Sequence, residues 1–205
     1  MITPTVHVVD DDESYVRASA RVLSSAGFVV RAFTSGKEFL AAAGPDSRGC
    51  VVADLEMPGL DGLALQAEMV RAGVLMPVVF LSGHGDIPRT VRAMQEGAVD
   101  FVEKTAPKHK LLDAVRRALA RDVSESDRRL KAAAVRERLA SLTPREHEVL
   151  GEVVRGLLNK QVAAKLGISE RTVKMHRTSI TRKLGVHSTA RLAVLTREAG
   201  LFEAG

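Results

Sequence analysis

Five short apolar segments rich in valine constrain the fold of this chain more than any other feature. They lie at residues 6–9, 28–32, 50–53, 78–81 and 101–102. The runs are mostly continuous instead of alternating, which is the pattern of strands covered on both faces. Helical patterns such as Ile87, Val91 and Met94, at i, i+4 and i+7, separate them. This alternation predicts an α/β domain: a doubly wound, five-stranded parallel sheet with helices on both faces.

Polar residues stand where four of these five predicted strands end. They are Asp10 and Asp11, Asp54, Ser82, and Lys104. Because the carboxyl ends of parallel strands share one edge of an open sheet, these side chains are predicted to meet in one pocket. Crowded carboxylates repel one another unless a cation intervenes, and oxygen ligands suit Mg²⁺. A lysine beside the metal then suits a phosphoryl group.

Each of these residues taken alone has a plainer explanation. An Asp after a strand usually serves as a turn or helix-cap residue, and Asp12 fits that role. Ser82 would also suit a cap of the following loop, and a single lysine is usually a solvated surface charge. The combination at four strand ends favours a functional pocket over turn chemistry.

Charge divides the chain near residue 120. Residues 1–120 hold 13 basic and 15 acidic side chains, a net charge of −2, whereas residues 121–205 hold 17 and 10, a net charge of +7. This division predicts that only the second part meets a polyanion. No apolar run approaches the roughly 18 residues that span a bilayer, and the N-terminus turns acidic where a signal peptide stays apolar. We therefore expect a cytoplasmic protein with no membrane partner.

The last third of the chain carries the signals of a small all-α domain of four helices. Thr143, Pro144 and Glu146 form a strong helix start, with an N-cap, an N1 proline and a capping box. Asn159 and Ser169 are further candidate caps, and a short glycine-containing turn precedes Ser169. Two short helices joined by such a turn have the arrangement of a helix-turn-helix.

A basic face is predicted on the second helix of this pair, residues 170–184. It consists of residues outside the apolar stripe: Arg171, Lys174, Arg177, Thr178 and Arg182. A solvated charged surface is the plainer interpretation. The turn, cap and charge signals together favour a helix whose N-terminus enters the major groove of DNA.

The middle of the chain is predicted to be a charged helix. Residues 108–141 contain neither Gly nor Pro, so we expect the last helix of the first domain to continue into a linker. The expected domain limits are 1–120, a helical linker at 121–140, and 141–205. A solvated spacer and a dimer-forming helix remain open for the linker, because its heptad pattern is poor.

Four motifs in the first domain are specific in combination. They are VVDDD at 8–12, DLEMPGLDG at 54–62, LSGHGD at 81–86 and DFVEK at 100–104. In these motifs the chain resembles the receiver domain of bacterial response regulators, which has a flavodoxin-like fold. The resemblance implies that Asp54 accepts a phosphoryl group from a sensor histidine kinase.

The same resemblance implies roles for the other pocket residues. Asp11, Asp54 and the backbone carbonyl of Glu56 would hold Mg²⁺ directly, and Asp10 would help through water. Lys104 would bridge the phosphoryl oxygens. The switch residues are Ser82, which would hydrogen-bond the phosphoryl group, and Phe101, which would change its packing.

Three segments of the second domain resemble the helix-turn-helix output domain of LuxR-type regulators: LTPREHEVL, GLLNKQVAAKLGIS and RTVKMHRTSITRKLGV. With the receiver, the chain resembles two-component response regulators of the FixJ/NarL family. By position, Lys174, Met175 and Thr178 would face base edges. The phosphates would be met by a second set: Lys160, Thr172, His176, Arg182 and Lys183. Arg171 and Arg177 complete the expected DNA-facing set.

The resemblance implies a transcription regulator and not an enzyme. Phosphorylation of Asp54 would control dimerisation and the binding of double-stranded DNA, and RNA polymerase is a further candidate partner. A phosphohydrolase with an aspartyl intermediate is the alternative from another class, but Asp54-Leu55-Glu56 lacks the second Asp of the DxD pattern.

Thr105 departs from the receiver pattern, which has a proline after the lysine in a cis peptide bond. A cis bond before Thr would cost roughly 3–4 kcal/mol, against about 0.5–1 kcal/mol before Pro. A trans bond there could move Lys104. This departure keeps open a phosphorylation-independent DNA-binding regulator with an atypical receiver.

Overall fold

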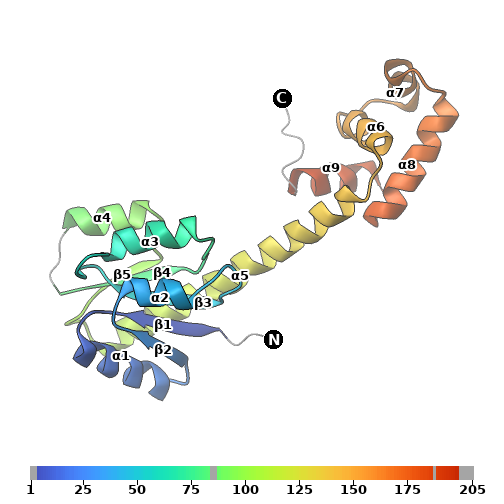
Figure 1. Ribbon diagram of the computed structural model, residues 1–205. Helices are drawn as coiled ribbons and strands as arrows, with labels where there is room; N and C mark the ends of the chain where they lie inside the picture. The colour runs from blue at the N-terminus through green and yellow to red at the C-terminus, as the bar shows by residue number, and fades with distance from the viewer. Residues whose placement is uncertain (1–3, 84–86, 187, 199–205) are drawn as a thin grey trace. The chain divides into compact units, whose positions relative to one another are not determined.

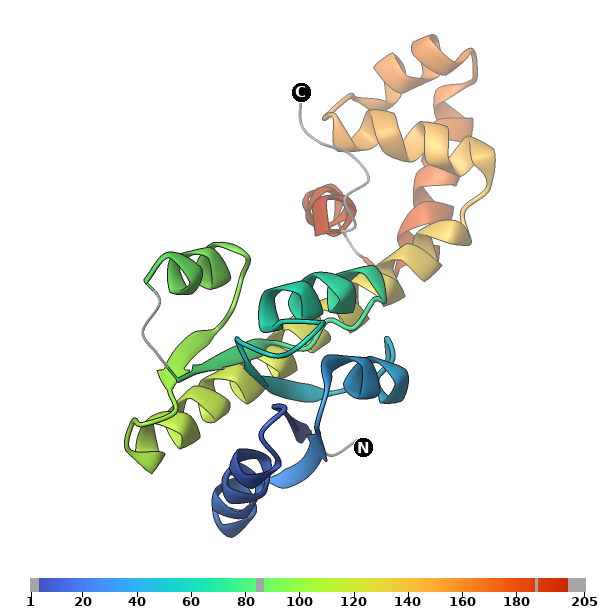
Figure 2. The same cartoon turned by 60° about the vertical axis from the view of Figure 1, so that its left-hand side comes forward.

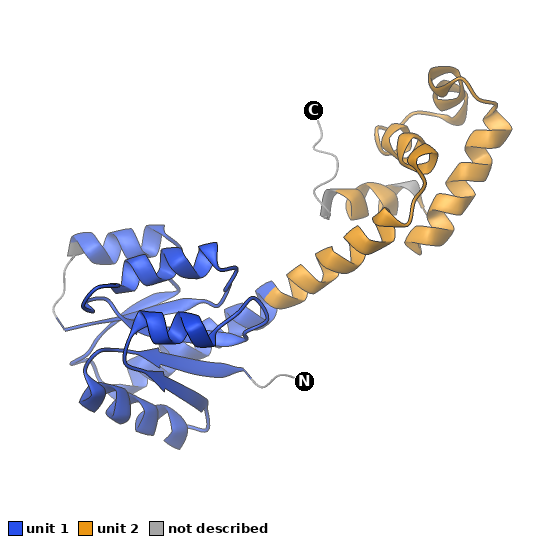
Figure 3. Cartoon of the chain, viewed as in Figure 1, with its two compact units in different colours: residues 1–125 blue, residues 126–205 orange. Residues whose placement is uncertain are grey.

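A computed structural model of the chain describes residues 4–83, 87–186 and 188–198 (Figure 1). The HGD part of the receiver motif, residues 84–86, lies outside these ranges. The chain forms two compact units, an N-terminal unit of residues 1–125 and a C-terminal unit of residues 126–205 (Figure 3). Each unit has its own hydrophobic core.

The N-terminal unit is built on a parallel sheet of five strands. They are β1 (Thr5–Val9), β2 (Val29–Phe33), β3 (Gly49–Asp54), β4 (Val78–Ser82) and β5 (Asp100–Glu103). Their order is β2-β1-β3-β4-β5, the doubly wound order of flavodoxin-like folds, which confirms the predicted fold class. The strand order reverses between β1 and β3, which is where such a sheet opens a crevice at its carboxyl edge.

Helices cover both faces of this sheet (Figure 2). They are α1 (Glu13–Ser25), α2 (Gly36–Ala42), α3 (Gly62–Arg71), α4 (Ile87–Gln95) and the first part of α5 (Lys108–Ala140). Successive strand residues serve opposite layers. Val52 belongs to the core shared with α1 and α5, whereas its neighbours Val51 and Ala53 belong to the core shared with α2, α3 and α4.

Two details of the burial differ from the sequence-based expectation. Strand β2 is at the edge of the sheet, and Val29 is 49% exposed, so it is not covered on both faces. On α4 the predicted apolar positions Val91 and Met94 are 48% and 45% exposed, whereas Ala93 is fully buried. The apolar spacing thus predicts the helix correctly but not the face that it buries.

Helix α5 is continuous over 33 residues, so the predicted helical continuation beyond the first domain is confirmed. Asp122 on this helix is 1% exposed, and its carboxylate accepts hydrogen bonds from the Gly49 backbone N–H at 3.1 Å and from Arg48 Nε at 3.3 Å. This contact fastens α5 to the start of β3. No helix among the described residues combines the length and the apolar character that crossing a membrane requires.

The C-terminal unit consists of the end of α5 and four further helices: α6 (Pro144–Val154), α7 (Asn159–Leu166), α8 (Glu170–Leu184) and α9 (Thr189–Glu198). The apolar stripe predicted for α8, Val173, Ile180 and Leu184, is at most 1% exposed. The turn between α7 and α8 begins at Gly167, whose φ of 64° is the left-handed conformation that favours glycine.

Helix caps explain where these helices begin. Thr143 caps α6 and forms the predicted capping box with Glu146, and Ser169 caps α8 as predicted. Asn159 is not a cap, contrary to expectation. It is the first residue of α7, and Leu158, which has no side-chain acceptor, occupies the N-cap position. The backbone N–H of Leu158 donates instead to Gln161 Oε1 at 2.8 Å.

Candidate functional site

Strand register brings the polar strand ends into one place. β1 and β3 pair so that Asp10, the first residue after β1, stands level with Asp54 at the end of β3. β4 and β5 pair so that Ser82 lies beside the last residue of β5, which Lys104 follows. With Asp11, these four residues form what we call the acidic pocket, at the carboxyl edge of the sheet.

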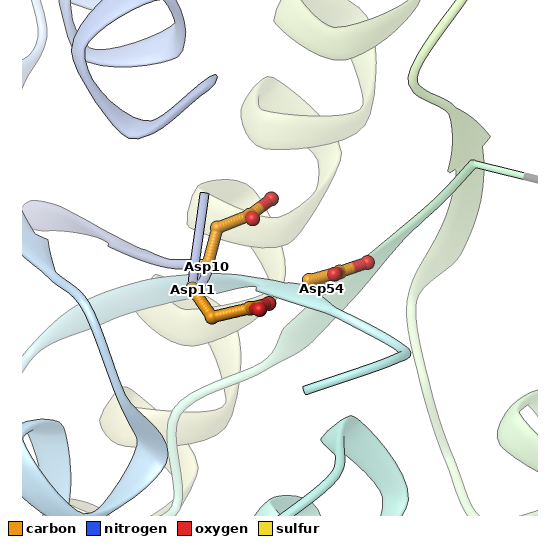
Figure 4. A group of neighbouring side chains, drawn as sticks. All are labelled: Asp10, Asp11 and Asp54. Carbon is orange, nitrogen blue, oxygen red and sulfur yellow. The ribbon is translucent and has the colours of Figure 1, made fainter. Parts of the chain in front are cut away.

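The three carboxylates of the acidic pocket converge (Figure 4). Asp10, Asp11 and Asp54 each place a carboxylate oxygen within 4.8 Å of those of the other two. Asp10 and Asp54 are 0% and 5% exposed, whereas Asp11 is exposed to solvent. A compact set of hard oxygen donors, open on one side to water, fits the coordination that Mg²⁺ prefers.

Lys104 reaches into the pocket and pairs with both buried carboxylates. Its Nζ lies 2.6 Å from Asp10 Oδ2 and 3.2 Å from Asp54 Oδ2. Burial and the charge of Asp10 raise the pKa of Asp54, and Lys104 opposes this rise. Burial lowers the pKa of Lys104, but the hydrogen bonds and charges of Asp10 and Asp54 outweigh it and raise the pKa above its ordinary value. Lys104 therefore remains an ammonium group at neutral pH.

The departure at Thr105 does not remove Lys104 from the pocket. All peptide bonds between described residues are trans, including the bond from Lys104 to Thr105. The backbone N–H of Lys104 donates to the Ser82 carbonyl at 2.8 Å, which fixes the loop on β4. The lysine thus reaches Asp10 and Asp54 from a trans backbone.

The remaining predicted pocket residues surround this centre. Ser82 is 1% exposed at the end of β4, and Phe101 is partly buried against the core beneath α2, α3 and α4. Glu56 turns its side chain to solvent, where Arg89 lies 3.2 Å away, while its backbone N–H donates to Asp54. Asp12 is the N-cap of α1, so its plainer interpretation is confirmed.

The predicted DNA-facing residues of the C-terminal unit differ in exposure. The exposed members are Lys160, Arg171, Lys174, Met175, Thr178 and Arg182. Partly buried are Thr172, His176, Arg177 and Lys183. A surface hollow between the start of α7 and α8 is lined by three cations, Lys160, Lys174 and Arg177, and by one carboxylate, Glu170, beside Thr178. Cations and short polar groups around a hollow suit an anionic ligand.

Two of the partly buried cations hold the unit together. Lys183 Nζ lies 2.6 Å from Glu146 Oε2 and donates to the Ser141 carbonyl at 3.2 Å. Glu146 is 4% exposed, and hydrogen bonds from Lys183 and Ser179 lower its pKa to about 2. Arg177 donates to Asn159 Oδ1 at 3.1 Å, which joins α8 to α7.

Sequence reasoning missed Tyr15 and Asp122. The ring of Tyr15 lies 4.7 Å from Lys104 Nζ, measured to the ring centroid, and Asp122 fastens α5 to β3. Both contacts join segments far apart in the chain, and neither residue belongs to a local motif. For Asp122, a lone carboxylate next to the apolar positions of a helix was the one available signal.

The fold and the pocket together define a class: a receiver-like unit joined to a helix-turn-helix unit. The sequence model of the response regulator receiver domain matches residues 6–116, and that of the bacterial regulatory proteins of the luxR family matches residues 140–196. The chain belongs to the two-component response regulators of the FixJ/NarL family.

Individual relatives agree over nearly the whole chain. Nodulation protein W of Bradyrhizobium diazoefficiens is 42% identical over 196 residues, which cover 96% of this chain and 86% of that protein. The transcriptional regulatory protein FixJ of Azorhizobium caulinodans is 40% identical over 199 residues, 97% of this chain and 94% of FixJ. Among solved structures, the response regulator StyR gives a TM-score of 0.83 at 42% identity, with 96% of this chain and all of StyR covered.

Proposed function

We propose that Asp54 is the phosphoacceptor of this regulator and that a sensor histidine kinase is its phosphodonor. A carboxylate oxygen of Asp54 attacks the phosphorus of a phosphohistidine, forming an O–P bond. The N–P bond breaks, and its electron pair returns to the imidazole, which takes up a proton. The geometry that supports this assignment is the approach of Lys104 to Asp54, because an ammonium offsets the repulsion between carboxylate and phosphoryl group.

Mg²⁺ is the proposed cofactor of this step. Asp11, Asp54 and the backbone carbonyl of Glu56 would hold it, with Asp10 nearby. A bound Mg²⁺ supplies positive charge that neutralises the incoming phosphoryl oxygens. The clustering of the three carboxylates supports this ligand set.

The proposed switch consists of Ser82 and Phe101. A phosphoryl group on Asp54 brings acceptor oxygens next to the end of β4, where the Ser82 hydroxyl donates to them. Movement of Ser82 changes the space available to Phe101 on the neighbouring strand. The phosphoryl group therefore biases the packing of β4 and β5.

The C-terminal unit is the proposed DNA-binding element. Lys174, Met175 and Thr178 are assigned to base edges. The phosphates are assigned to Lys160, Thr172, His176, Arg182 and Lys183. Arg171 and Arg177 complete the set that faces the duplex, and Arg177 and Lys183 also make the internal contacts described above. Binding as a dimer to two half-sites adds affinity and specificity.

We further propose the arrangement of the whole regulator. Its receiver ends near residue 120, a helical linker spans 121–140, and the DNA-binding domain occupies 141–205. Phosphorylation promotes the homodimer, and the DNA-bound dimer has RNA polymerase as a further partner. The protein acts in the cytoplasm and turns over no substrate beyond its own phosphoryl group.

The alternative is a DNA-binding regulator that does not depend on phosphorylation. It rests on Thr105, which replaces the proline expected after Lys104. The ammonium of Lys104 lies 3.2 Å from Asp54 with the 104–105 bond trans, which favours phosphorylation control over this alternative.

The experiment that tests the proposal is DNA binding at fixed salt by wild type and Asp54→Asn. Each protein is incubated with Mg²⁺, with and without acetyl phosphate, and offered duplexes selected from a random pool. Salt is held constant because a basic unit binds any DNA at low ionic strength. We expect acetyl phosphate to tighten the binding of selected duplexes and to produce dimers in wild type only. Equal affinities for both proteins under all conditions would favour the phosphorylation-independent alternative.

A further inference from the structure

The ring of Tyr15 contacts the Lys104 ammonium, although no sequence motif assigns a role to Tyr15. It is the third residue of α1, and its ring centroid lies 4.7 Å from Lys104 Nζ. The face of an aromatic ring carries partial negative charge and attracts a cation within about 6 Å. The ammonium therefore has three neighbours of favourable charge: the Asp10 carboxylate, the Asp54 carboxylate and this ring.

The position of the Tyr15 ring is itself fixed. The ring packs against the core that α1 and α5 share with the sheet. Its hydroxyl shares a hydrogen bond with Ser19, one turn further along α1 and 4% exposed. Its backbone N–H donates to the N-cap residue Asp12 at 3.3 Å. Because α1 begins at Glu13, shortly after the pocket residues Asp10 and Asp11, the ring lies beside the acidic pocket.

Lys104, by contrast, depends on neighbouring residues to fix the direction of its side chain. A lysine side chain is a flexible four-carbon chain that ends in a small, strongly hydrated charge, so it does not fix its own direction. The loop after Lys104 lacks the proline of the receiver pattern, and Thr105 is exposed. Asp10 attracts the ammonium more closely than Asp54 does, at 2.6 Å against 3.2 Å. The ring face of Tyr15 lies against the same ammonium that pairs with these two carboxylates.

We propose that Tyr15 is a positioning residue for Lys104, and that it sets how fast Asp54 accepts and loses its phosphoryl group. This inference rests on the proposed phosphorylation of Asp54. In the loss step, water attacks phosphorus, the bond from phosphorus to the Asp54 oxygen breaks, and its electron pair returns to the carboxylate. The proton of the attacking water leaves with the phosphate or passes to solvent. A held ammonium stabilises the charge that develops on the phosphoryl oxygens when the group is transferred.

The test compares rings of the same shape and different charge. Tyr15→Phe keeps the negative face, and Tyr15→pentafluoro-Phe reverses it at nearly constant size. Tyr15→Leu removes the ring and leaves a smaller apolar side chain. Each full-length protein is phosphorylated with acetyl phosphate and Mg²⁺, and the rates of formation and hydrolysis of the acyl phosphate are measured. We expect Tyr15→Phe to retain most of the formation rate, and the other two variants to lose about three- to tenfold.

Phe28→Leu is the matched control, because Phe28 packs against the same core without a contact to Lys104 in the described structure. It is expected to lower the thermal midpoint as Tyr15→Leu does, but to leave the formation rate at the wild-type value. Equal rates for the Phe and pentafluoro-Phe variants would overturn the inference and leave Tyr15 as a packing residue. Absence of phosphorylation in wild type would instead overturn the proposed function itself. Asp54→Asn, combined with each variant, gives the signal that is measured without an acyl phosphate on Asp54.

Discussion

The acidic pocket and the basic face hold their charged side chains in opposite surroundings. In the acidic pocket Asp10 and Asp54 are buried, and both are paired with Lys104. On the basic face Arg171 and Lys174 are exposed, and neither has an ion-pair partner within the part of the chain that the structure describes. A prearranged pocket suits one small ligand, because little reorganises when the ligand arrives. Solvated side chains suit a long polyanion, which they bind by displacing its counterions.

This comparison is tested most severely at Lys104. Lys104→Met removes the cation that offsets the Asp54 charge, so we expect phosphorylation by acetyl phosphate to slow about 100-fold. The pKa of Asp54, already raised by burial and by Asp10, rises further without the lysine. The rate of acyl phosphate formation is the measurement. Lys108→Met, at an exposed position at the start of α5, is the control and should be neutral. A rate loss shared by both variants would show that net charge, and not the paired geometry, controls the reaction.

A second prediction concerns the ion pair between the buried carboxylate Glu146 and Lys183 in the C-terminal unit. Glu146→Gln keeps the shape of the side chain but removes the charge that Lys183 and Ser179 hydrogen-bond. We expect the free energy of unfolding at pH 7 to fall by about 2 kcal/mol, because hydrogen bonds to charged groups are the stronger ones. Chemical denaturation of the wild type and the variant gives this number.

The same variant has a defined pH signature. The pKa of Glu146 is lowered to about 2 in the folded protein, whereas an unfolded Glu has a pKa near 4.5. Its stabilisation is therefore complete above the unfolded pKa and is lost as the pH falls from about 5 towards 2. The variant should lack this component. Glu148→Gln, on the solvent side of α6, should behave as the wild type. An unchanged acid transition in Glu146→Gln would mean that other carboxylates control it.

Lys174 and Lys183 sharpen the comparison because they lie on the same helix. Lys174 is exposed, whereas Lys183 pairs with Glu146. Because Lys174 is assigned to base edges, Lys174→Ala should weaken the binding of the selected duplexes about tenfold and relax the specificity at the contacted base. Lys183→Ala, which removes a proposed phosphate contact that also pairs with Glu146, should lower the stability of the unit and reduce the salt slope of log affinity by less than one. Fluorescence anisotropy at four salt concentrations separates the two effects. An unchanged slope in Lys183→Ala would remove Lys183 from the proposed phosphate contacts.

The acidic pocket was predictable from the sequence because strand order in a parallel sheet converts chain position into spatial position. Asp10, Asp54, Ser82 and Lys104 each follow or end a strand, so only the register was needed to bring them together. Residues that reach the pocket from a helix carry no such signal. Tyr15 is therefore absent from the sequence-based set, although it lies beside Lys104.

Helix faces and caps were less predictable for a related reason. The spacing of Val91 and Met94 predicts α4, but neighbouring elements decide which face is buried, and Ala93 is the residue that packs. Helix α2 has no apolar stripe long enough to detect. Its start is marked by Ser35, whose hydroxyl accepts from the Glu38 backbone N–H, and by Glu38, which accepts from Thr34 in return. That capping pattern was the available signal.

The smallest expected effect is at Leu158, the N-cap of α7. Leucine offers no oxygen to the free backbone N–H groups of the first turn, and its side chain is 70% exposed, so it contributes little packing. Leu158→Ser supplies the missing acceptor and should stabilise the C-terminal unit by about 0.5–1 kcal/mol. Leu158→Ala, which removes the same side chain without adding an acceptor, isolates the cap. Chemical denaturation measures the stability of both.

The DNA affinity of the two Leu158 variants tests whether Leu158 belongs to the DNA interface. The residue lines the hollow that also contains Lys160 and Lys174. If Leu158→Ser is more stable but binds DNA as the wild type does, Leu158 takes no part in the interface. If both Leu158 variants bind more weakly, an apolar contact at the start of α7 belongs to the interface, and exposed cations are not sufficient to explain DNA binding by this unit.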